Sequence, residues 1–293
     1  MKKVLVIGSI SIDNTIYTDS LPSAGTTVSA NSYFTNVGGK GANQACACLF
    51  LGGDVTFVGA VGKDNNGKTV KEFLSSQGLN YSIKDSDKPT GVAFIMLEES
   101  SGENRILIVQ GANKDLTEGD INALDNLFVP GDILLTQFEN TPEIVQYVVK
   151  KAKERGMLVV VNPAPANPFD ENYYQYIDYL VPNEHELEQL TGIKDQIEAC
   201  HYLLDKGAKN VIVTLGENGS MLVNNKESFK VDPHKVKAVD TTAAGDSYLG
   251  ALTYKLSIGV SIKEAMEFAS LASSKTVTKK GAIISLPHQD DFI

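Results

Sequence analysis

Cysteine is scarce in this 293-residue chain, and the three that occur are odd in number and lack the spacing of a zinc site. We therefore expect no cysteine-held metal and interpret Cys46, Cys48 and Cys200 as reduced core thiols. The four histidines are scattered and predict no metal cluster. Long hydrophobic runs are also missing, since none approaches the roughly 20 residues of a membrane span. The opening MKKVLVIGSISID turns polar too early for a signal peptide, so we expect a cytoplasmic protein.

Positive charge is in deficit as well. Lys and Arg number 26 against 36 Asp and Glu, which gives a formal net charge of −10. This balance argues against nucleic acid or an anionic membrane as a partner. It does not exclude an anionic nucleotide, because local amides and a metal outweigh a distant mean field. The apolar content of 42% is ordinary for a globular protein, and a cytoplasmic enzyme is the default expectation.

Short apolar strands alternate with amphipathic helices along most of the chain. The strands are almost entirely apolar, as parallel strands covered on both faces must be. The pattern predicts an α/β fold with a doubly wound, mostly parallel central sheet and helices on both faces. The expected strands are 4–7, 55–61, 133–136, 158–162, 179–181 and 211–215, and the expected helices are 41–51, 67–77, 142–155, 197–206 and 247–256.

Two segments interrupt this alternation. Residues 12–37 contain β-branched, alternating stretches without a helical pattern, and residues 90–109 predict a hairpin closed by a Ser-Gly-Glu turn. We interpret both as a small β-sheet lid outside the main sheet. Because no linker, low-complexity run or internal repeat separates them, residues 1–293 are expected to form a single domain.

The most informative motif is VDTTAAGD, residues 239–246, which precedes an apolar helical run. Residues 240–242 are strong N-cap types, and the small residues 243–245 leave the first N–H groups of the helix uncovered. Such groups bind anions, including phosphate. A carboxylate at Asp246 beside that anion hole suggests a base that deprotonates a hydroxyl. The alternative is an ordinary capped helix with an acid in its first turn.

A second motif, GKDNNGKT at residues 62–69, matches the P-loop pattern between a predicted strand and a predicted helix. Its interior is bulky and polar where a phosphate cradle needs small residues, and Asp64 would place a carboxylate inside the cradle. No predicted strand ends in the aspartate that holds magnesium in such proteins. We interpret the motif as a turn and helix cap. In the alternative, a P-loop NTPase, Lys68 would be essential.

Polar side chains gather at the predicted carboxyl ends of strands, where open α/β sheets bind ligands. Asp13 follows the first strand and Glu139 follows the strand at 133–136. GGKGANQA, residues 38–45, is a glycine-rich turn in which Lys40 and Asn43 can hydrogen-bond to a polyol. In isolation these features also fit a turn acid and an ordinary strand-to-helix connection.

Three further strand-end segments carry weaker signals. In PNEHE, Asn183 and Glu186 offer the hard oxygen ligands that suit magnesium, or else a helix cap beside a solvated acid. TLGENG, residues 214–219, fits either a phosphate-holding turn or a plain hairpin turn. GAIIS, residues 281–285, offers backbone carbonyls that together with those near Asp240 could hold a monovalent cation.

From residue 4 to residue 287, the chain resembles the ribokinase-like carbohydrate kinase family. The resemblance rests on seven motifs taken together: GSISID, GGKGANQA, NPAPA, PNEHELEQLTG, TLGENG, VDTTAAGD and VTKKGAIISLP. GGKGANQA points within it to the ribokinase and deoxyribokinase branch. The resemblance implies ATP as co-substrate, magnesium, a potassium activator and a lid that closes over the sugar and often dimerises.

The resemblance also implies a role for each matching position. Asp246 would be the base, with an anion hole formed by the amides of Ala243, Ala244 and Gly245. The sugar would be held by Ser11, Asp13, Gly39, Lys40, Asn43 and Glu139. Magnesium would be organised through water by Asn183 and Glu186. The nucleotide would be lined by Asn183, Thr214, Leu215, Gly216, Gly219 and Gly245. The potassium site would comprise Asp240, Thr242, Thr276, Lys279, Gly281 and Ser285.

One position departs from the family pattern. The sugar-contacting turn usually reads Asn-x-Asp, whereas this chain has Ser11-Ile12-Asp13, and serine offers one hydroxyl in place of an amide. The expected activity is phosphorylation of the 5-hydroxyl of D-ribose by ATP. The alternatives are a deoxyribokinase, a nucleoside kinase and a non-catalytic sugar-binding protein, the last of which would need neither Asp246 nor an anion hole. We expect a homodimer through the lid.

Overall fold

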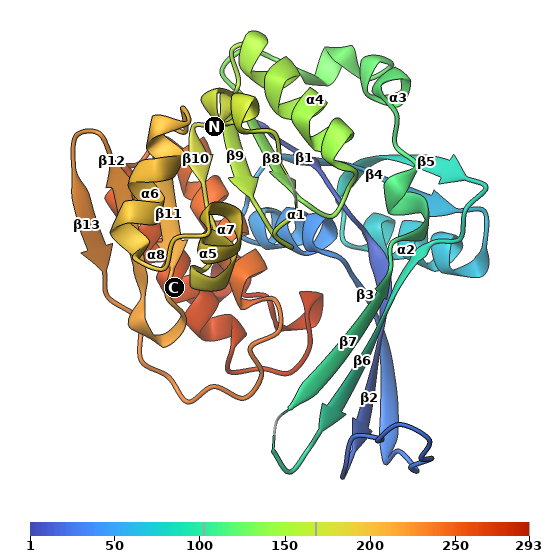
Figure 1. The fold of residues 1–293 in the computed structure, drawn as a ribbon. Helices are drawn as coiled ribbons and strands as arrows, with labels where there is room; N and C mark the ends of the chain where they lie inside the picture. The colour runs from blue at the N-terminus through green and yellow to red at the C-terminus, as the bar shows by residue number, and fades with distance from the viewer. Residues whose placement is uncertain (102, 168, 293) are drawn as a thin grey trace.

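The computed structural model describes residues 1–101, 103–167 and 169–292, and within them one large sheet carries the body of the molecule (Figure 1). Nine strands form this sheet in the order β13-β12-β11-β10-β9-β8-β1-β4-β5. Their bounds are β1 Val4–Ile7, β4 Val55–Gly62, β5 Asn80–Ser86, β8 Ile133–Gln137, β9 Leu158–Asn162, β10 Tyr179–Leu180, β11 Asn210–Thr214, β12 Ser220–Asn224 and β13 Ser228–Val231.

The strands from β11 through β5 pair in parallel, which confirms the predicted α/β fold. In β1, Val4 and Val6 belong to one core cluster and Leu5 and Ile7 to the other, so alternate residues face opposite layers of helices. Burial on both faces explains why the central strands read as continuous apolar runs rather than alternating ones.

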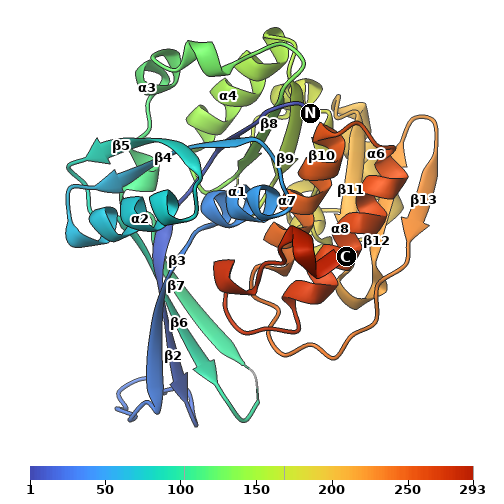
Figure 2. The same ribbon diagram turned by 180° about the vertical axis from the view of Figure 1, so that it is seen from behind.

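Helices cover both faces of the sheet. On one side lie α1 (Lys40–Phe50), α2 (Asn65–Ser76), α7 (Ala244–Ser257) and α8 (Ile262–Thr276), which are nearest the viewer in Figure 2. On the other lie α4 (Pro142–Glu154) and α6 (Gln196–Asp205), with the short α3 (Glu118–Asn122) and α5 (Glu184–Thr191) at the periphery. Among the described residues, no helix is both long and apolar enough to cross a membrane.

The sequence missed one edge of the sheet. β12 pairs antiparallel with β11, and β13 pairs antiparallel with β12, so TLGENG forms the hairpin turn between β11 and β12. The start of α7 also differs from expectation. Its cap is Ala243, in the left-handed conformation with φ 59°, and not one of the polar residues 240–242. Asp240 instead accepts hydrogen bonds from the N–H groups of Thr242 and Gly281, which occupies its carboxylate elsewhere.

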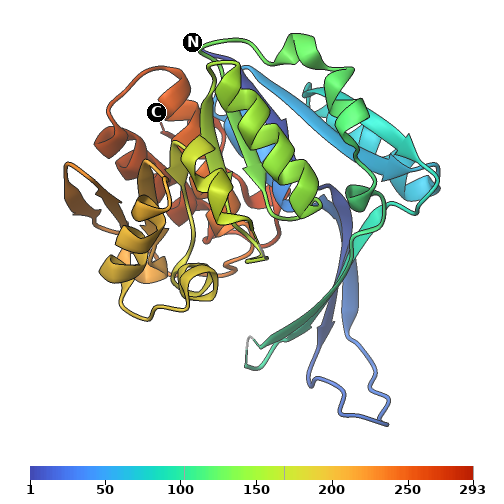
Figure 3. The same ribbon diagram turned by 45° about the horizontal axis from the view of Figure 1, so that its top comes forward.

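A second sheet of four described strands has the order β3-β2-β6-β7 and projects from the body (Figure 3). Its strands are β2 Ser11–Thr18, β3 Ser32–Gly38, β6 Gly91–Glu98 and β7 Asn104–Val109. The small sheet was predicted from the two β-rich segments, and the β6–β7 hairpin is antiparallel as expected. β2 and β6 run parallel, although they are far apart in sequence. We call these four strands the lid sheet.

Candidate active site

Asp246 lies in the first turn of α7 and is 7% exposed. Its Oδ2 accepts a hydrogen bond of 2.8 Å from Nδ2 of Asn43, and its Oδ1 accepts one of 2.9 Å from Nε2 of Gln44. Both donors come from α1. Hydrogen bonds to a charged group contribute about 1.5–3 kcal/mol each, so the pair fixes the carboxylate firmly against α1.

The N-terminus of α7 offers free backbone donors beside this carboxylate. The N–H of Ala244 donates to the carbonyl of Thr241 at 3.2 Å. For Gly245 and Asp246, the described part of the chain provides no backbone or side-chain acceptor. The N–H of Ala243 also has no acceptor among the described residues. The helix end therefore presents free N–H groups to an anion, together with the positive end of its dipole.

A hollow of about 210 Å³ opens at this helix end, and we call it the α7 hollow. It draws residues from the ends of three strands, β9, β10 and β11, and from the starts of α1, α5 and α7, which is where ligands bind in open α/β sheets. Its lining residues are Lys40, Asn162, Ala164, Val181, Asn183, Glu186, Thr214, Thr241, Ala243, Ala244, Gly245, Asp246 and Leu249.

The predicted sugar ligands adjoin this hollow on the lid side. Asn43 is buried, and its Oδ1 has no hydrogen-bond partner among the described residues while its amide nitrogen serves Asp246. A buried acceptor left in this state favours a ligand that donates a hydroxyl proton. Gly39 caps α1 with φ 91°, and any Cβ there would come within 2.7 Å of the Ile10 Cα.

Asp13 stands at the base of the lid sheet, where β2 leaves the body. Its Oδ1 accepts a hydrogen bond of 2.7 Å from the Ser11 hydroxyl, so Ser11 contacts Asp13. Gly38, which pairs with Ser11, lies against this carboxylate: a Cβ there would come within 1.9 Å of Oδ2 of Asp13, so a larger residue would displace the Asp13 side chain. Burial raises the pKa of Asp13 to about 6, with the Ser11 hydrogen bond opposing and the charges of Glu139 and Asp246 adding to the rise.

Glu139 anchors the start of α1. Its Oε2 accepts the N–H of Lys40 at 3.0 Å and the hydroxyl of Ser9. Lys40 in turn points its charge into a group of carboxylates. Burial lowers the pKa of Lys40, but the charges of Asp246, Glu139, Glu186 and Asp13 outweigh that effect and raise it overall. Lys40 therefore stays protonated and offers a positive charge next to the N–H groups of α7.

Asn183 and Glu186 form a capping box at the start of α5. The Asn183 side chain accepts the N–H of Glu186 at 2.8 Å, and Glu186 Oε2 accepts the N–H of Asn183 at 2.9 Å. Both residues also line the α7 hollow. Burial raises the pKa of Glu186, although the backbone hydrogen bond and the charge of Lys40 oppose it. The cap therefore leaves a carboxylate facing the hollow, which fits a water-mediated magnesium ligand.

The candidate potassium loops lie next to each other behind α7. The Oδ2 of Asp240 accepts the N–H of Gly281 at 2.9 Å, and Val239 N–H donates to the carbonyl of Val277. Thr276 and Ser285 direct their hydroxyls to Ser247 Oγ and to the carbonyl of Ala282. Within the described ranges, no group of three or more His, Cys, Asp or Glu could hold a metal ion. A carbonyl-rich site contains few such side chains, so this finding does not bear on potassium.

Several predicted positions lie outside the α7 hollow. Thr214 lines it, whereas Leu215, Gly216 and Gly219 belong to the hairpin turn behind it. The P-loop-like segment is also away from it. Its Asp64 caps α2 through the N–H of Gly67 and holds both the N–H and the hydroxyl of Thr90. Asp64 is therefore a structural link between α2 and the lid sheet.

Sequence reasoning missed three buried polar residues. Gln44 contacts Asp246, Gln137 contacts Gln44, and Asn162 lines the α7 hollow. Gln44 lies inside GGKGANQA, four residues after Lys40, and this helical spacing could have indicated that both face the same side of α1. Asn162 is the last residue of a predicted strand, and its place at a strand end is the same signal that indicated Glu139 as a candidate.

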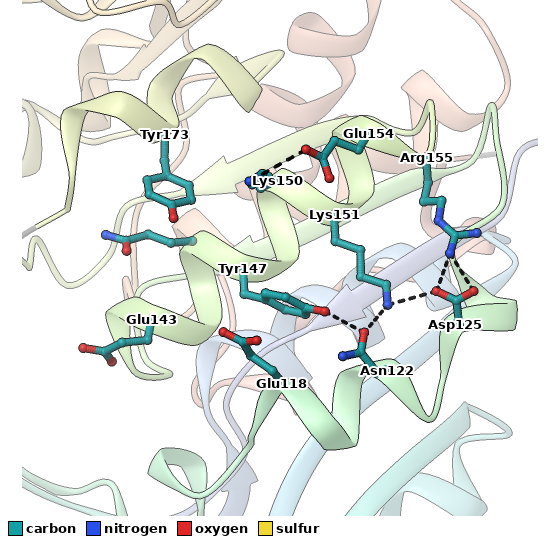
Figure 4. Close-up of a pocket in the computed structure, with 11 residues that line it drawn as sticks. Glu118, Asn122, Asp125, Glu143, Tyr147, Lys150, Lys151, Glu154, Arg155 and Tyr173 are labelled. Carbon is teal, nitrogen blue, oxygen red and sulfur yellow. Dashed lines mark hydrogen bonds and ion pairs between the residues drawn. The ribbon is translucent and has the colours of Figure 1, made fainter.

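A larger hollow lies elsewhere, along the outer face of α4 (Figure 4). Most of its charged side chains pair with one another: Lys151 and Arg155 both contact Asp125, at 2.9 and 2.7 Å. It shares no lining residue with the α7 hollow. Because most of its charged side chains are already engaged in ion pairs with one another, it does not have the convergent polar groups of a catalytic site.

A buried carboxylate beside free N–H groups at a helix start can accept a hydroxyl proton while the N–H groups hold an anionic group such as phosphoryl. The sequence matches the model of the pfkB family carbohydrate kinases over residues 1–289. The chain belongs to this family, and it is a phosphotransferase acting on a sugar hydroxyl. The resemblance identified from the motifs is thereby confirmed.

Several curated relatives match over nearly their full length. A ribokinase from Haemophilus influenzae is 36% identical over 301 residues, covering 100% of this chain and 98% of the relative. A deoxyribokinase from Salmonella typhi is also 36% identical, with 99% and 97% covered. Among solved structures, a ribokinase from Thermotoga maritima superposes with a TM-score of 0.93 at 36% identity, covering 99% and 98%. An Arabidopsis thaliana ribokinase complexed with ribose and ATP gives 0.88 at 33%, covering 99% and 96%.

The raised pKa of Asp13 predicts a pH dependence of sugar use. Below pH 6 the carboxyl is protonated and accepts hydroxyl protons poorly. We therefore expect kcat/KM for the sugar to fall as pH drops through about 6, approaching roughly tenfold per pH unit. Asp13→Asn, which is neutral throughout, should be slow and lack this inflection. A wild-type profile that stays flat from pH 5 to 8 would contradict the prediction.

Proposed function

We propose that this protein transfers the γ-phosphoryl group of ATP to the 5-hydroxyl of D-ribose. The observation that carries the proposal is the carboxylate of Asp246, buried beside the free N–H groups of Gly245 and Asp246 itself. Ribokinases at 36% identity over the full length, and one at 33% complexed with ribose and ATP, support ribose as the sugar and ATP as the donor.

In the proposed mechanism, Asp246 accepts the proton of the primary hydroxyl while the N–H groups at the start of α7 hold the transferring phosphoryl group. Lys40 adds a positive charge on the same side of the hollow. Phosphoryl transfer needs little covalent chemistry, so alignment and charge stabilisation account for most of the catalysis. The sugar hydroxyls are held by Asp13, Gly39, Lys40, Asn43 and Glu139, with the free Oδ1 of Asn43 as one acceptor.

The nucleotide is proposed to enter from the β11 side, past Thr214 and the hairpin turn of Leu215, Gly216 and Gly219. Magnesium supplies positive charge to the phosphates when bound. Glu186 and Asn183 would hold it through water, because the Glu186 carboxylate faces the hollow while its Oε2 caps α5. These residues keep the polyphosphate in line with the acceptor hydroxyl.

A coupled assay with ATP and a panel of ribose, 2-deoxyribose, fructose and nucleosides tests this function. We expect ribose to give the highest kcat/KM. Asp246→Asn should leave ATP binding largely intact and lower kcat by about 10²–10⁴, the usual contribution of a positioned base. Near wild-type turnover in that variant would remove Asp246 from the mechanism.

Lys68→Ala is the control for the P-loop alternative. Lys68 is exposed on α2 and lies near Glu72, outside the α7 hollow. The variant should retain full sugar kinase activity, whereas a P-loop NTPase would lose activity. Tight sugar binding without turnover in the wild type would favour the non-catalytic alternative.

Deoxyribose is the second candidate substrate, because Ser11 stands where the family usually has asparagine. The Ser11 hydroxyl donates its only proton to Asp13, so it has no proton left to donate to a ring hydroxyl, whereas an asparagine amide there would offer donors. A site that does not bind a hydroxyl directly discriminates weakly against the analogue that lacks it. The deoxyribokinase at 36% identity supports keeping this sugar in the panel.

Potassium is proposed to bind between the loops that carry Asp240 and Gly281, through backbone carbonyls of the segment 276–285. Asp240 ties the two loops together, so a cation there would stiffen the N-terminus of α7 without touching substrate. We expect higher kcat in KCl than in NaCl at equal ionic strength, and loss of this difference in Asp240→Ala. Equal rates in both salts for the wild type would contradict the prediction.

The lid sheet is proposed to mediate a homodimer. Its edge strands expose apolar side chains, with Tyr33 75% and Leu107 63% exposed, and small sheets with open edges need covering. We expect sedimentation at micromolar concentration to show a dimer, and Leu107→Asp to weaken it. Ile197→Asp on α6, which is 41% exposed on the body, is the matched control and should leave the dimer intact. A monomeric wild type would refute the proposal.

A further inference from the structure

Gln44, in the second turn of α1, is fully buried and makes three hydrogen bonds through one side chain. Its Nε2 donates to Asp246 Oδ1 at 2.9 Å and to Asn162 Oδ1 at 3.1 Å. Its Oε1 accepts from Gln137 Nε2 at 2.7 Å. Gln44 therefore sits between the proposed base and the end of β8, and it does not itself line the α7 hollow.

The Asp246 carboxylate determines how the side-chain amides of Gln44 and Gln137 are oriented. A carboxylate only accepts hydrogen bonds when ionised, so the amide nitrogen of Gln44 must face Asp246. The oxygen of Gln44 then faces Gln137, which must present its own nitrogen in return. A flipped Gln44 would place its oxygen against Asp246 and lose both donated bonds. The interior thus holds Gln44 in one orientation through partners on both sides.

We propose that Gln44 is a positioning residue for phosphoryl transfer, which holds the Asp246 carboxylate in its working rotamer. The inference rests on the proposed role of Asp246 as the base. Asn43 holds Oδ2 and Gln44 holds Oδ1, both from the same helix, so the plane of the carboxylate is fixed relative to α1. Each oxygen keeps a second lone pair, which leaves the carboxylate able to accept a proton. Fixed orientation of the base contributes to rate because small displacements of reacting groups are costly.

Three charged groups on other residues also face Asp246 and are not altered by a substitution at Gln44. They are Lys40 from α1, Asp13 from β2 and Glu186 from α5, each of which interacts electrostatically with Asp246. Loss of a hydrogen-bond donor makes a carboxylate hold its proton more tightly. Removing the Gln44 donors therefore moves the acidic limb of the kcat profile to higher pH.

The first test replaces Gln44 by methionine, which keeps the length of the side chain and removes its donors. The acceptor sugar is whichever one the wild type phosphorylates fastest, so substrate identity does not enter. We expect kcat to fall about tenfold or more, as for loss of one hydrogen bond to a charged group, with KM for sugar and ATP changed less than about twofold. The acidic limb of kcat should move to higher pH.

A second variant and a control separate positioning from stability. Gln44→Glu preserves the shape and places a second carboxyl against Asp246, so its acidic limb should move further than that of Gln44→Met. Thr253→Val is the control, because Thr253 is fully buried on the same helix as Asp246 and its hydroxyl has no partner among the described residues. It should keep the wild-type kcat and pH profile.

The outcomes are distinguishable from failure of the proposed base. Asp246→Asn is assayed in parallel, and wild-type turnover in that variant overturns both ideas. If Asp246→Asn is slow but Gln44→Met retains kcat within twofold, Gln44 does not position the base. If both Gln44 variants lose rate only in proportion to their loss of folded protein, with pH profiles unmoved, Gln44 is structural and the proposal is wrong.

Discussion

The close approach of α7 to α1 is the contact on which the site depends. Gly250, one turn after Asp246, lies at this crossing, where a Cβ would come within 2.4 Å of the Ala47 side chain and 2.9 Å of the Gln44 carbonyl. Because residues four apart share a helix face, the same approach brings Asp246 to the amides of Asn43 and Gln44. A larger residue at 250 would separate the helices and so withdraw the carboxylate from both donors.

The electrostatics of the site follow from this packing. Carboxylates from three other elements, Asp13, Glu139 and Glu186, share the region with Asp246, and Lys40 is the cation among them. An overall charge of −10 would repel a polyphosphate. The free N–H groups of α7 and the Lys40 ammonium supply local positive potential, and bound magnesium would add to it. Local donors can therefore outweigh the net charge of the chain, as the composition alone could not reveal.

Much of the fold followed from pattern, and the failures have identifiable causes. Parallel strands such as Val4–Ile7 were legible because they are buried on both faces. β12 and β13 were missed because TLGENG fits a ligand-binding turn and a hairpin equally well. The predicted cap of α7 was wrong because Asp240 accepts a hydrogen bond from the N–H of the distant Gly281, and local capping preference does not reveal such a contact. Gln44 was missed for the same reason, since its partners Asp246 and Gln137 lie 202 and 93 residues away in the sequence.

The lid sheet joins the body through a few contacts that also border the site. Asn113 holds both the N–H and the carbonyl of Ile10, at 3.0 and 2.8 Å, immediately before β2 begins at Ser11. The start of β2, which carries Asp13, is therefore tied to the body by hydrogen bonds. The far end of β2 touches the body through Lys280, whose Nζ lies 5.3 Å from the centre of the Tyr17 ring. Lys280 precedes Gly281, the residue tied to Asp240. The lid sheet, which carries Asp13 at its base, thus also contacts the loop that is hydrogen-bonded to Asp240, so the sugar side of the site and the loops behind α7 share one structural element.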